Sequence, residues 1–342
     1  MDKIVRRIKA YNGQIIYTVY TTYHLLLALT MIFMSNRIKD TTVVMTTYDK
    51  RDLQNFRLIS KRMSNFGIRG VVIDKKNVFH RLLGLSWIEN TIIYKKICKE
   101  ANIINDDFYL VNFSWALKRV FYPASYYFKK CKETIFVQDG VLQYVVPENS
   151  MIKLFIQSLY GSVIGYWKYD KLKCIFVEHP EKFPDYLRPK IIHFVFSGER
   201  LLSDQRNSIK EILLDDESRE ELSTLKKARG IIFTQPFVGD GFLSEEENRK
   251  IFRELTEFYK RYGSVVLKVH PRDNVDYSYL GIPIINGKYP SEIYAFDNIE
   301  FEFAIGICTS AIWTIEAKKK VLINENFLTD KKFKLVALEE VV

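Results

Sequence analysis

Apolar and polar positions along the chain alternate between two kinds of segment. Short, almost wholly apolar runs rich in β-branched residues, such as residues 14–20 and 42–46, predict buried strands. Longer segments whose apolar residues recur every three or four positions, such as 52–65 and 244–262, predict amphipathic helices. Because strands and helices follow one another in this way, the sequence predicts an α/β fold built from parallel βαβ units.

This alternation occurs twice along the chain. The first half adds predicted strands at 70–73, 108–112, 134–137, 174–177 and 191–196, and predicted helices at 24–35 and 115–129. The second half has predicted strands at 230–234, 264–269, 282–285, 303–308 and 321–324, with further helices at 204–214, 291–296 and 310–319. A polar, charge-rich segment, 197–229, lies between the two series. We therefore expect two domains, 1–200 and 201–342.

The composition excludes several classes of protein. With 47% hydrophobic residues, including 24 Phe and 21 Tyr, the chain can bury a core and is not disordered. Its four cysteines are widely spaced and form no CxxC pair, so neither a disulfide framework nor a metal site is expected. The formal charge of +10 predicts an anionic partner: a nucleotide substrate, an acidic membrane surface or nucleic acid. The sequence contains no nucleic-acid-binding motif, which disfavours the last of these.

Two apolar stretches raise the question of a membrane span. Residues 14–36 contain no Lys, Arg, Asp or Glu and follow a basic stretch at positions 3–9, in the outline of a signal anchor. The polar residues Thr18, Thr21 and His24 interrupt this stretch and favour a strand, a turn and a helix instead. Residues 151–167 also contain polar residues and predict a helix and a loop.

Peripheral contact with a membrane is a separate expectation. The basic positions in 3–9 and the aromatic and basic run 121–132 both suit an anionic membrane interface, although the run also fits an ordinary amphipathic surface. The cysteine spacing fits a reducing compartment. We therefore expect a cytoplasmic protein that associates peripherally with the inner face of the membrane.

Ligands of open α/β domains bind in the crevice at the carboxyl ends of the strands, so the residues that follow each strand are candidates. In the first domain, Gln138, Asp139 and Gly140 follow a predicted strand and could present a carboxylate to a substrate. An ordinary Asp-Gly turn is the alternative. Candidates for contact with a sugar, which could equally cap the following helix, are Thr21, Thr22 and Tyr23.

In the second domain, the strongest candidate is His270, which Pro271 holds in an extended backbone at the tip of a predicted strand. Lys268 and Arg272 flank it and add positive potential for a phosphate. A plain loop histidine is the alternative. A second His-Pro pair begins at His179 in what reads as connecting chain, and there we expect a structural role.

Two more loops of the second domain follow predicted strands. Gln235 and Pro236 open a glycine-containing loop that could approach a nucleotide, although it matches neither the P-loop nor the dinucleotide fingerprint. Thr309 and Ser310 precede a predicted helix, where hydroxyls and backbone N–H groups could bind an anion or simply cap the helix.

Together these features resemble the bacterial sialyltransferases, most closely glycosyltransferase family 52, which includes lipooligosaccharide sialyltransferases. That family has an acidic–acidic–Gly motif in its N-terminal domain, a His-Pro motif in its C-terminal domain, and Ser/Thr near the donor phosphate. The resemblance extends over residues 14–324 and rests on Gln138-Asp139-Gly140, His270-Pro271-Arg272 and Thr309-Ser310, in the same order.

The resemblance implies the GT-B fold, in which two Rossmann-like domains face each other across a cleft. It also implies an inverting transfer of sialic acid from CMP-sialic acid to a cell-surface glycan, capsule or lipooligosaccharide, without a metal or other cofactor. Asp139 would be the general base, and His270 would meet the departing phosphate as acid or cation. The donor nucleotide or its phosphate would contact Gln235, Pro236, Lys268, Pro271, Arg272, Thr309 and Ser310. The acceptor or sugar would contact Thr21, Thr22, Tyr23, Gln138 and Gly140.

The sequence departs from the family motif at its first position, where Gln138 stands in place of an acidic residue. Since an amide cannot act as a base, only Asp139 can have that role here. The departure leaves open a GT-B glycosyltransferase that uses another nucleotide sugar. A third hypothesis is a non-catalytic basic protein that binds polyanions or membranes through its charge.

Overall fold

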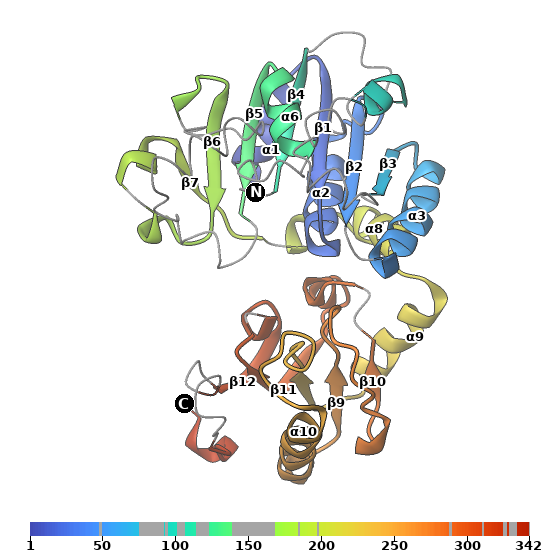
Figure 1. Ribbon diagram of the computed structural model, residues 1–342, viewed down its shortest axis with the longest axis vertical. Coiled ribbons are helices and arrows are strands. Elements are labelled where there is room, and N and C mark those ends of the chain that lie inside the picture. Colours follow the sequence, from blue (N-terminus) through green and yellow to red (C-terminus); the bar gives the residue numbers. More distant parts are fainter. Residues whose placement is uncertain are drawn as a thin grey trace. The chain divides into compact units, whose positions relative to one another are not determined.

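The computed structural model describes residues 1–47, 50–74, 92, 95–100, 107–113, 123–138, 168–183, 185–196, 198–286, 289–309, 311–323, 327 and 334–341. These residues form two compact units, Met1–Ile212 and Leu213–Val342, each with its own parallel sheet (Figure 1). The prediction of two Rossmann-like α/β domains, the composition of the GT-B fold, is confirmed. The division falls within helix α8 (Ser203–Leu213), whereas the sequence predicted it after residue 200.

The first unit has a sheet of seven parallel strands among the residues described, in the order β3-β2-β1-β4-β5-β6-β7. The strands are β1 (Gln14–Val19), β2 (Thr41–Thr47), β3 (Arg69–Asp74), β4 (Phe108–Asn112), β5 (Glu133–Val137), β6 (Leu172–Val177) and β7 (Ile191–His193). Its longer helices, besides α8, are α1 (Asp2–Ala10), α2 (Thr22–Ser35), α3 (Lys50–Asn65) and α6 (Pro123–Lys130). The strand order changes direction at β1, so the topological switch point lies between β1 and β4.

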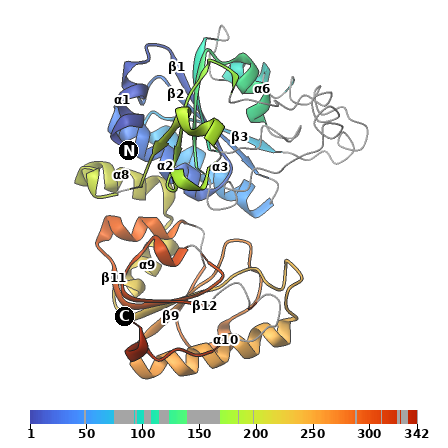
Figure 2. The same cartoon turned by 90° about the vertical axis from the view of Figure 1, so that its left-hand side faces the viewer.

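Helices cover both faces of this sheet, which explains why its strands are almost wholly apolar. Helix α6 packs Tyr127 and Phe128 onto one face, in a core that includes Phe108 and Leu110 of β4. Tyr109 alternates with these residues and therefore faces the other side, where the ring of Tyr11, just after α1, packs on it at 5.1 Å. Figure 2 shows α1 and α6 on opposite sides of the strands.

The second unit has a sheet of five parallel strands in its described part, in the order β10-β9-β8-β11-β12. The strands are β8 (Gly230–Phe233), β9 (Val265–Lys268), β10 (Ile284–Ile285), β11 (Glu300–Ile307) and β12 (Glu316–Ile323), and the longer helices are α9 (Asp216–Leu225) and α10 (Glu245–Tyr259). The order again changes direction at the first strand, so the switch point lies between β8 and β11.

Helix α10 lies along one face of this second sheet (Figure 2). It buries Phe252, Leu255 and Tyr259 in one core with residues of β8, β9, β11 and β12. Its start confirms the predicted capping box: Ser244 Oγ accepts the Glu247 N–H at 3.1 Å, and Glu247 Oε2 accepts the Ser244 N–H at 2.7 Å.

The segment after β11 corrects a prediction. The sequence predicted a helix over 310–319, but the chain forms only a short 3₁₀ turn, Ala311–Trp313 (η10), and then enters β12. β12 pairs in parallel with β11 from Glu316 to Ile323. The Ala and Lys residues of this segment favour a helix, and burial of its alternate residues against the core outweighs that weak preference.

Residues 14–36 confirm the predicted strand, turn and helix, as β1 and α2. Among the described residues, no helix has both the length and the apolar composition needed to cross a bilayer. The second apolar stretch, 151–167, lies outside the described residues.

The aromatic and basic run 121–132 is only partly the interface surface that the sequence suggested. Tyr127 and Phe128 are fully buried in the core of the first unit, because α6 packs this side on the sheet. Lys129 is exposed, whereas residues 121 and 122 lie outside the described ranges. The two buried rings therefore cannot contact a membrane.

Candidate functional site

The switch points select one edge of each sheet as the candidate site. In the second unit, the carboxyl ends of β8 and β11 lead into Gln235 and Thr309 respectively, and β9, the neighbour of β8, leads into His270. Parallel pairing in register places these three ends at the same edge. The predicted donor-binding residues of this unit therefore follow neighbouring strands, at the edge where open α/β sheets bind ligands.

His270 begins a tight turn that hydrogen bonds fix at several points. Its carbonyl accepts the Asp273 N–H at 2.8 Å, and Pro271 occupies the second position of this four-residue turn, as proline prefers. Its own N–H donates to Thr234 Oγ1 at 3.0 Å, just beyond β8. The turn thus joins the carboxyl ends of β9 and β8.

The imidazole of His270 is held in one tautomer. Its Nδ1 accepts the backbone N–H of Arg272 at 3.1 Å, so a neutral ring carries its proton on Nε2. Burial lowers the pKa of His270 to about 4, and the neighbouring Arg272 guanidinium also lowers it. At neutral pH the free protein therefore offers an N–H donor at this residue and not a positive charge, and the role of His270 toward a leaving phosphate stays a prediction.

Arg272 links two loops at this edge. Its Nη1 and Nη2 donate to the two carboxylate oxygens of Asp240 at 3.1 and 3.2 Å. Asp240 belongs to the glycine-containing loop that Gln235 and Pro236 begin. Because this bidentate pair is exposed to solvent, it contributes little to stability, and Arg272 is accessible to a competing anion.

Lys268, the last residue of β9, flanks His270 as the sequence indicated, and its side chain is buried. Its Nζ donates to the Tyr289 carbonyl at 3.3 Å and lies 4.3 Å from the centre of the Tyr289 ring. Burial lowers its pKa to about 7, against the opposing effect of Glu221 and Glu292. In this conformation the ammonium is bound within the protein, and contact of Lys268 with a donor phosphate stays a prediction.

The end of β11 is shaped by a close approach of two residues. Cys308 has a positive φ of 48°, and the next residue, Thr309, folds back over Gly306. A Cβ on Gly306 would lie 2.4 Å from Thr309 Cγ2, so glycine is required there. Thr309 Oγ1 accepts the Ala311 N–H at 3.3 Å, while Ser310 lies outside the described residues. The sequence predicted a long helix here, whose dipole could bind a phosphate. Because η10 has only three residues, it does not supply such a dipole.

In the first unit, the candidate motif follows β5. Gln138 is 7% exposed, and its Oε1 accepts the N–H of Glu178, beyond the end of β6, at 2.6 Å. Its own N–H donates to the Phe176 carbonyl at 2.9 Å. Gln138 therefore connects two strand ends, and Asp139 and Gly140 lie outside the described residues.

The turn after β1 lies at the switch point of the first sheet. Thr21 Oγ1 accepts the His24 N–H at 3.2 Å and so caps α2, while Thr22 and Tyr23 are partly exposed in the first turn of the helix. His24 is fully buried and stacks on Phe113, which follows β4, at 5.3 Å between ring centres. The capping alternative for Thr21 is thus present, and contact with a sugar stays a prediction.

Two residues of the site, Thr234 and Asp273, were not predicted from the sequence. Thr234 Oγ1 donates to Asp273 Oδ2 at 2.7 Å while it accepts the His270 N–H, so both residues contact the His-Pro turn. Asp273 had a signal in the sequence, since it occupies the fourth position of a turn that Pro271 predicts. Thr234 had none, because it is 36 residues away from His270 along the chain.

The described part of the site has donors suited to an anion. It offers the Nε2–H of His270, the guanidinium of Arg272 and the polar turn at Thr309 along one sheet edge. Within the described ranges, no group of three or more His, Cys, Asp or Glu could hold a metal ion. The second His-Pro pair differs: His179 is exposed and contacts Glu181 at 3.2 Å, at the start of a short 3₁₀ turn.

Comparison with known proteins supplies a family. The model of glycosyltransferase family 52 matches residues 38–326. A curated Haemophilus influenzae protein, described only as uncharacterized, is 23% identical over 195 residues, which span 56% of this chain and 62% of that protein.

Two solved structures are also similar to this chain. One is a putative UDP-N-acetylglucosamine 2-epimerase from Listeria monocytogenes, with 12% identity, a TM-score of 0.47, and coverage of 88% of this chain and 76% of that one. The other is S. aureus MnaA with UDP, with 10% identity, a TM-score of 0.46, and coverage of 88% and 75%.

Proposed function

Since the chain belongs to glycosyltransferase family 52, we propose that this glycosyltransferase is an inverting sialyltransferase that uses CMP-sialic acid. The acceptor would be a cell-surface glycan, of a capsule or a lipooligosaccharide. The observation that supports the proposal is the tautomer of His270, which presents an N–H donor at the carboxyl ends of the strands, where open α/β domains in general bind their ligands.

The proposed reaction is a direct displacement. A hydroxyl oxygen of the acceptor attacks the anomeric carbon of the sialic acid, and the bond from this carbon to the phosphate oxygen of CMP breaks. Asp139 takes the proton of the attacking hydroxyl, and CMP leaves with the electron pair of the broken bond. The bond formed and the bond broken balance without a metal or a redox cofactor.

His270 would act on the leaving group. Its Nε2–H donates a hydrogen bond to the phosphate oxygen that gains negative charge as the bond breaks, which stabilises the transition state most. A neutral imidazole suffices, because the departing phosphate is a stable anion. Arg272 and the turn at Thr309 and Ser310 would bind the other phosphate oxygens. For this, the Arg272 guanidinium would leave the Asp240 carboxylate and bind the phosphate of CMP-sialic acid instead.

The role of Gln138 supports Asp139 as the base. The side-chain oxygen of Gln138 accepts a backbone N–H, which a carboxylate in the same place could also do. If the first residue of the motif serves to accept this hydrogen bond, Gln138 can stand there, and Asp139 at the second position can still be the base. The second candidate is therefore the hypothesis that Gln138 first suggested, a GT-B glycosyltransferase that uses a nucleotide sugar other than CMP-sialic acid.

A donor panel tests the proposal. The purified protein is incubated with CMP-sialic acid and with a set of UDP- and GDP-sugars, and slow hydrolysis of each donor is followed by release of the nucleotide. We expect CMP release from CMP-sialic acid, and a CMP-dependent rise in melting temperature. Hydrolysis of a UDP-sugar alone would favour the second candidate, and indifference to every nucleotide would favour a non-catalytic polyanion-binding protein.

We further propose that helix α1 mediates peripheral contact with an anionic membrane. The helix buries Ile4, Val5 and Ile8. On its exposed side it carries four basic residues without a carboxylate partner among the described residues, namely Lys3, Arg6, Arg7 and Lys9. Each such cation near an anionic surface contributes about 1 kcal/mol to binding.

A further inference from the structure

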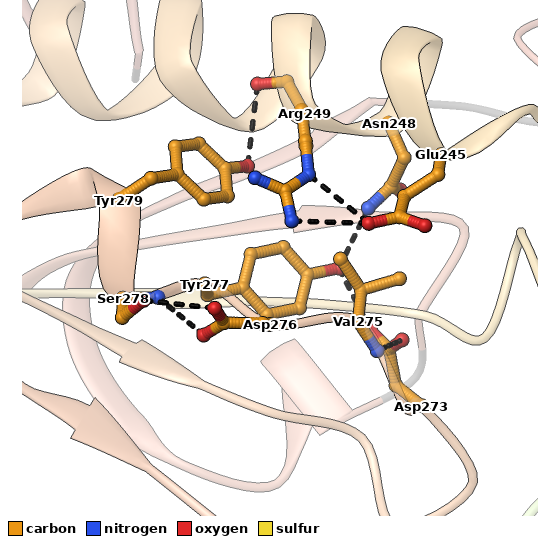
Figure 3. A network of polar contacts seen from close by, with 9 residues as sticks. All are labelled: Glu245, Asn248, Arg249, Asp273, Val275, Asp276, Tyr277, Ser278 and Tyr279. Carbon is orange, nitrogen blue, oxygen red and sulfur yellow. Dashed lines mark hydrogen bonds and ion pairs between the residues drawn. The ribbon is translucent and has the colours of Figure 1, made fainter.

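A buried carboxylate lies behind the His-Pro turn. Asp273 is 8% exposed, and its two oxygens accept three hydrogen bonds. Figure 3 shows the two that come from Tyr277 and Val275. Oδ2 accepts the Thr234 hydroxyl at 2.7 Å and the Tyr277 hydroxyl at 2.8 Å, and Oδ1 accepts the Val275 N–H at 3.2 Å. Such a set suits an ionised carboxylate, which accepts hydrogen bonds and donates none.

The hydrogen bonds around Asp273 all have the same direction. Asn248 Nδ2 donates to the Tyr277 oxygen at 2.9 Å, and Tyr277 donates its own proton to Asp273. On the other side, the His270 N–H donates to the Thr234 oxygen, and Thr234 donates to Asp273. Because each hydroxyl gives its single proton to Asp273, both chains of donors depend on an acceptor at that position.

The Thr234 hydroxyl contacts both ends of the His-Pro turn. It accepts the N–H of His270, the first residue, and donates to the side chain of Asp273, the fourth. Between these ends, the Arg272 N–H reaches His270 Nδ1 only while the turn keeps this shape. The tautomer of the imidazole is thereby connected to a carboxylate that does not touch the ring.

We propose that Asp273 is a positioning residue that acts through Thr234 to hold His270 with its Nδ1 on the Arg272 amide, so that its Nε2–H can serve as a donor to a ligand. The consequence for catalysis rests on the proposed function, in which that N–H meets the leaving phosphate. In the proposed reaction, Asp273 and Thr234 act only through their hydrogen bonds to the turn and are assigned no contact with the reacting atoms.

Thr234 and Tyr277 each donate a hydrogen bond to Asp273, but only Thr234 also contacts His270. Variants of these two residues therefore distinguish an effect on the position of the imidazole from a loss of stability. Thr234→Val keeps the shape of the side chain and removes the hydroxyl, and Thr234→Ser restores the hydroxyl. Tyr277→Phe is the matched control, because it removes one hydrogen bond from the same Asp273 oxygen without touching the turn. Asp273→Asn tests the carboxylate itself, since an amide nitrogen would face two hydroxyl donors.

The first measurement does not depend on catalysis. Long-range proton–nitrogen NMR spectra of the imidazoles report which ring nitrogen carries the proton, and the His270 signals are assigned by their loss in His270→Ala. We expect the Nε2–H pattern in the parent protein, Thr234→Ser and Tyr277→Phe. Thr234→Val and Asp273→Asn should show a mixture of tautomers. An unchanged Nε2–H pattern in folded Thr234→Val would overturn the proposal, as would the same mixture in Tyr277→Phe.

The second measurement is turnover with CMP-sialic acid. We expect Thr234→Val to lower kcat roughly tenfold or more with little change in the donor KM, because the misplaced donor acts in the transition state. Thr234→Ser should recover most of the rate. If the tautomer changes while kcat stays the same, His270 has no role on the phosphate, and the proposed function fails while the positioning of the ring is supported. Melting temperatures identify any variant that fails to fold.

Discussion

The side-chain oxygen of Gln138 accepts the backbone N–H of Glu178 at 2.6 Å, and this bond joins the ends of two neighbouring strands, β5 and β6. In the proposed assignment of the motif, Gln138 stands where family 52 has an acidic residue. Amide and carboxylate oxygens both accept a backbone N–H, so either residue can make this hydrogen bond.

Replacing Gln138 by Glu should therefore keep both folding and transfer. Gln138→Leu has a similar size but removes the acceptor of the partly buried Glu178 N–H bond, and it should lower the free energy of unfolding by about 1 kcal/mol. Urea denaturation and a sialyl-transfer assay measure the two effects. A large gain in transfer for Gln138→Glu would instead identify the first motif position as the base.

Asp139→Asn should nearly abolish transfer, since an amide of the same size cannot take the proton of the acceptor hydroxyl. Binding of CMP should survive, because the proposed nucleotide contacts lie in the second unit. Calorimetric titration with CMP and a transfer assay on the same sample test both parts. If the variant keeps most of its turnover, Asp139 is a turn residue and the base is another carboxylate.

His270→Ala should fold and lower turnover roughly tenfold or more, because it removes a donor that acts chiefly in the transition state. His179→Ala is the control from the exposed His-Pro pair and should change turnover little. If His179→Ala lowers turnover and His270→Ala does not, the wrong His-Pro pair was assigned to the binding of CMP-sialic acid.

Protonation of His270 should not limit activity near neutral pH. Its pKa of about 4 lies below the usual 6.5, so the folded free protein keeps the ring neutral through the range from pH 7 down to about 5. Between pH 6.5 and 4 the imidazole is protonated in the unfolded chain but neutral in the folded protein. The contribution of His270 to the free energy of unfolding therefore decreases as the pH falls through this interval. An NMR titration of the free protein measures the midpoint, and a value near 6.5 would contradict the buried, hydrogen-bonded ring described here.

Lys268 should make stability rise with pH. Burial lowers its pKa from 10.5 to about 7. Below pH 7 both states bind the proton and the full cost of burying the charge is present, whereas between pH 7 and 10.5 only the unfolded chain binds it. The free energy of unfolding therefore gains up to about 1.4 kcal/mol per pH unit in that interval from this group.

Lys268→Met should remove that contribution, and the control is Lys318→Met, a change of an exposed lysine on β12. Urea denaturation is measured from pH 6 to 10, and the difference between parent and variant is compared. Parallel curves for the parent and Lys268→Met would show that the ammonium is not buried.

The α1 proposal predicts salt-sensitive binding to vesicles that contain anionic lipids. Changing the four basic residues of α1 to Gln should reduce binding strongly, and 1 M salt should do the same, because the screening length then falls to about 3 Å. A control with the same change of charge replaces four exposed lysines elsewhere, namely Lys61, Lys227, Lys250 and Lys318. Equal loss in both variants would mean that net charge, and not α1, governs binding.

Much of the fold followed from local sequence. Apolar β-branched runs identified most strands, and Ser244 with Glu247 identified the start of α10, because these signals depend on neighbours within a few residues. Likewise Pro271 indicated that His270 lies at the end of a strand, because proline restricts the residue before it to an extended backbone. Two helices, α1 and α9, were missed, since both lie in segments dominated by charge.

The contacts that define the candidate site were decided by tertiary structure. β12 formed where local preference favoured a helix, because a neighbouring strand was available for pairing. The sequence placed Lys268 beside His270, but only the structure shows that its ammonium is buried beside Tyr289. Thr234 meets His270 and Asp273 only because β8 and β9 pair in parallel and end at the same edge. The sequence by itself determined which residues follow most of the strands. Which of those residues touch was decided by the order of the strands in the sheet, and that order depends on the burial of both faces of the sheet together.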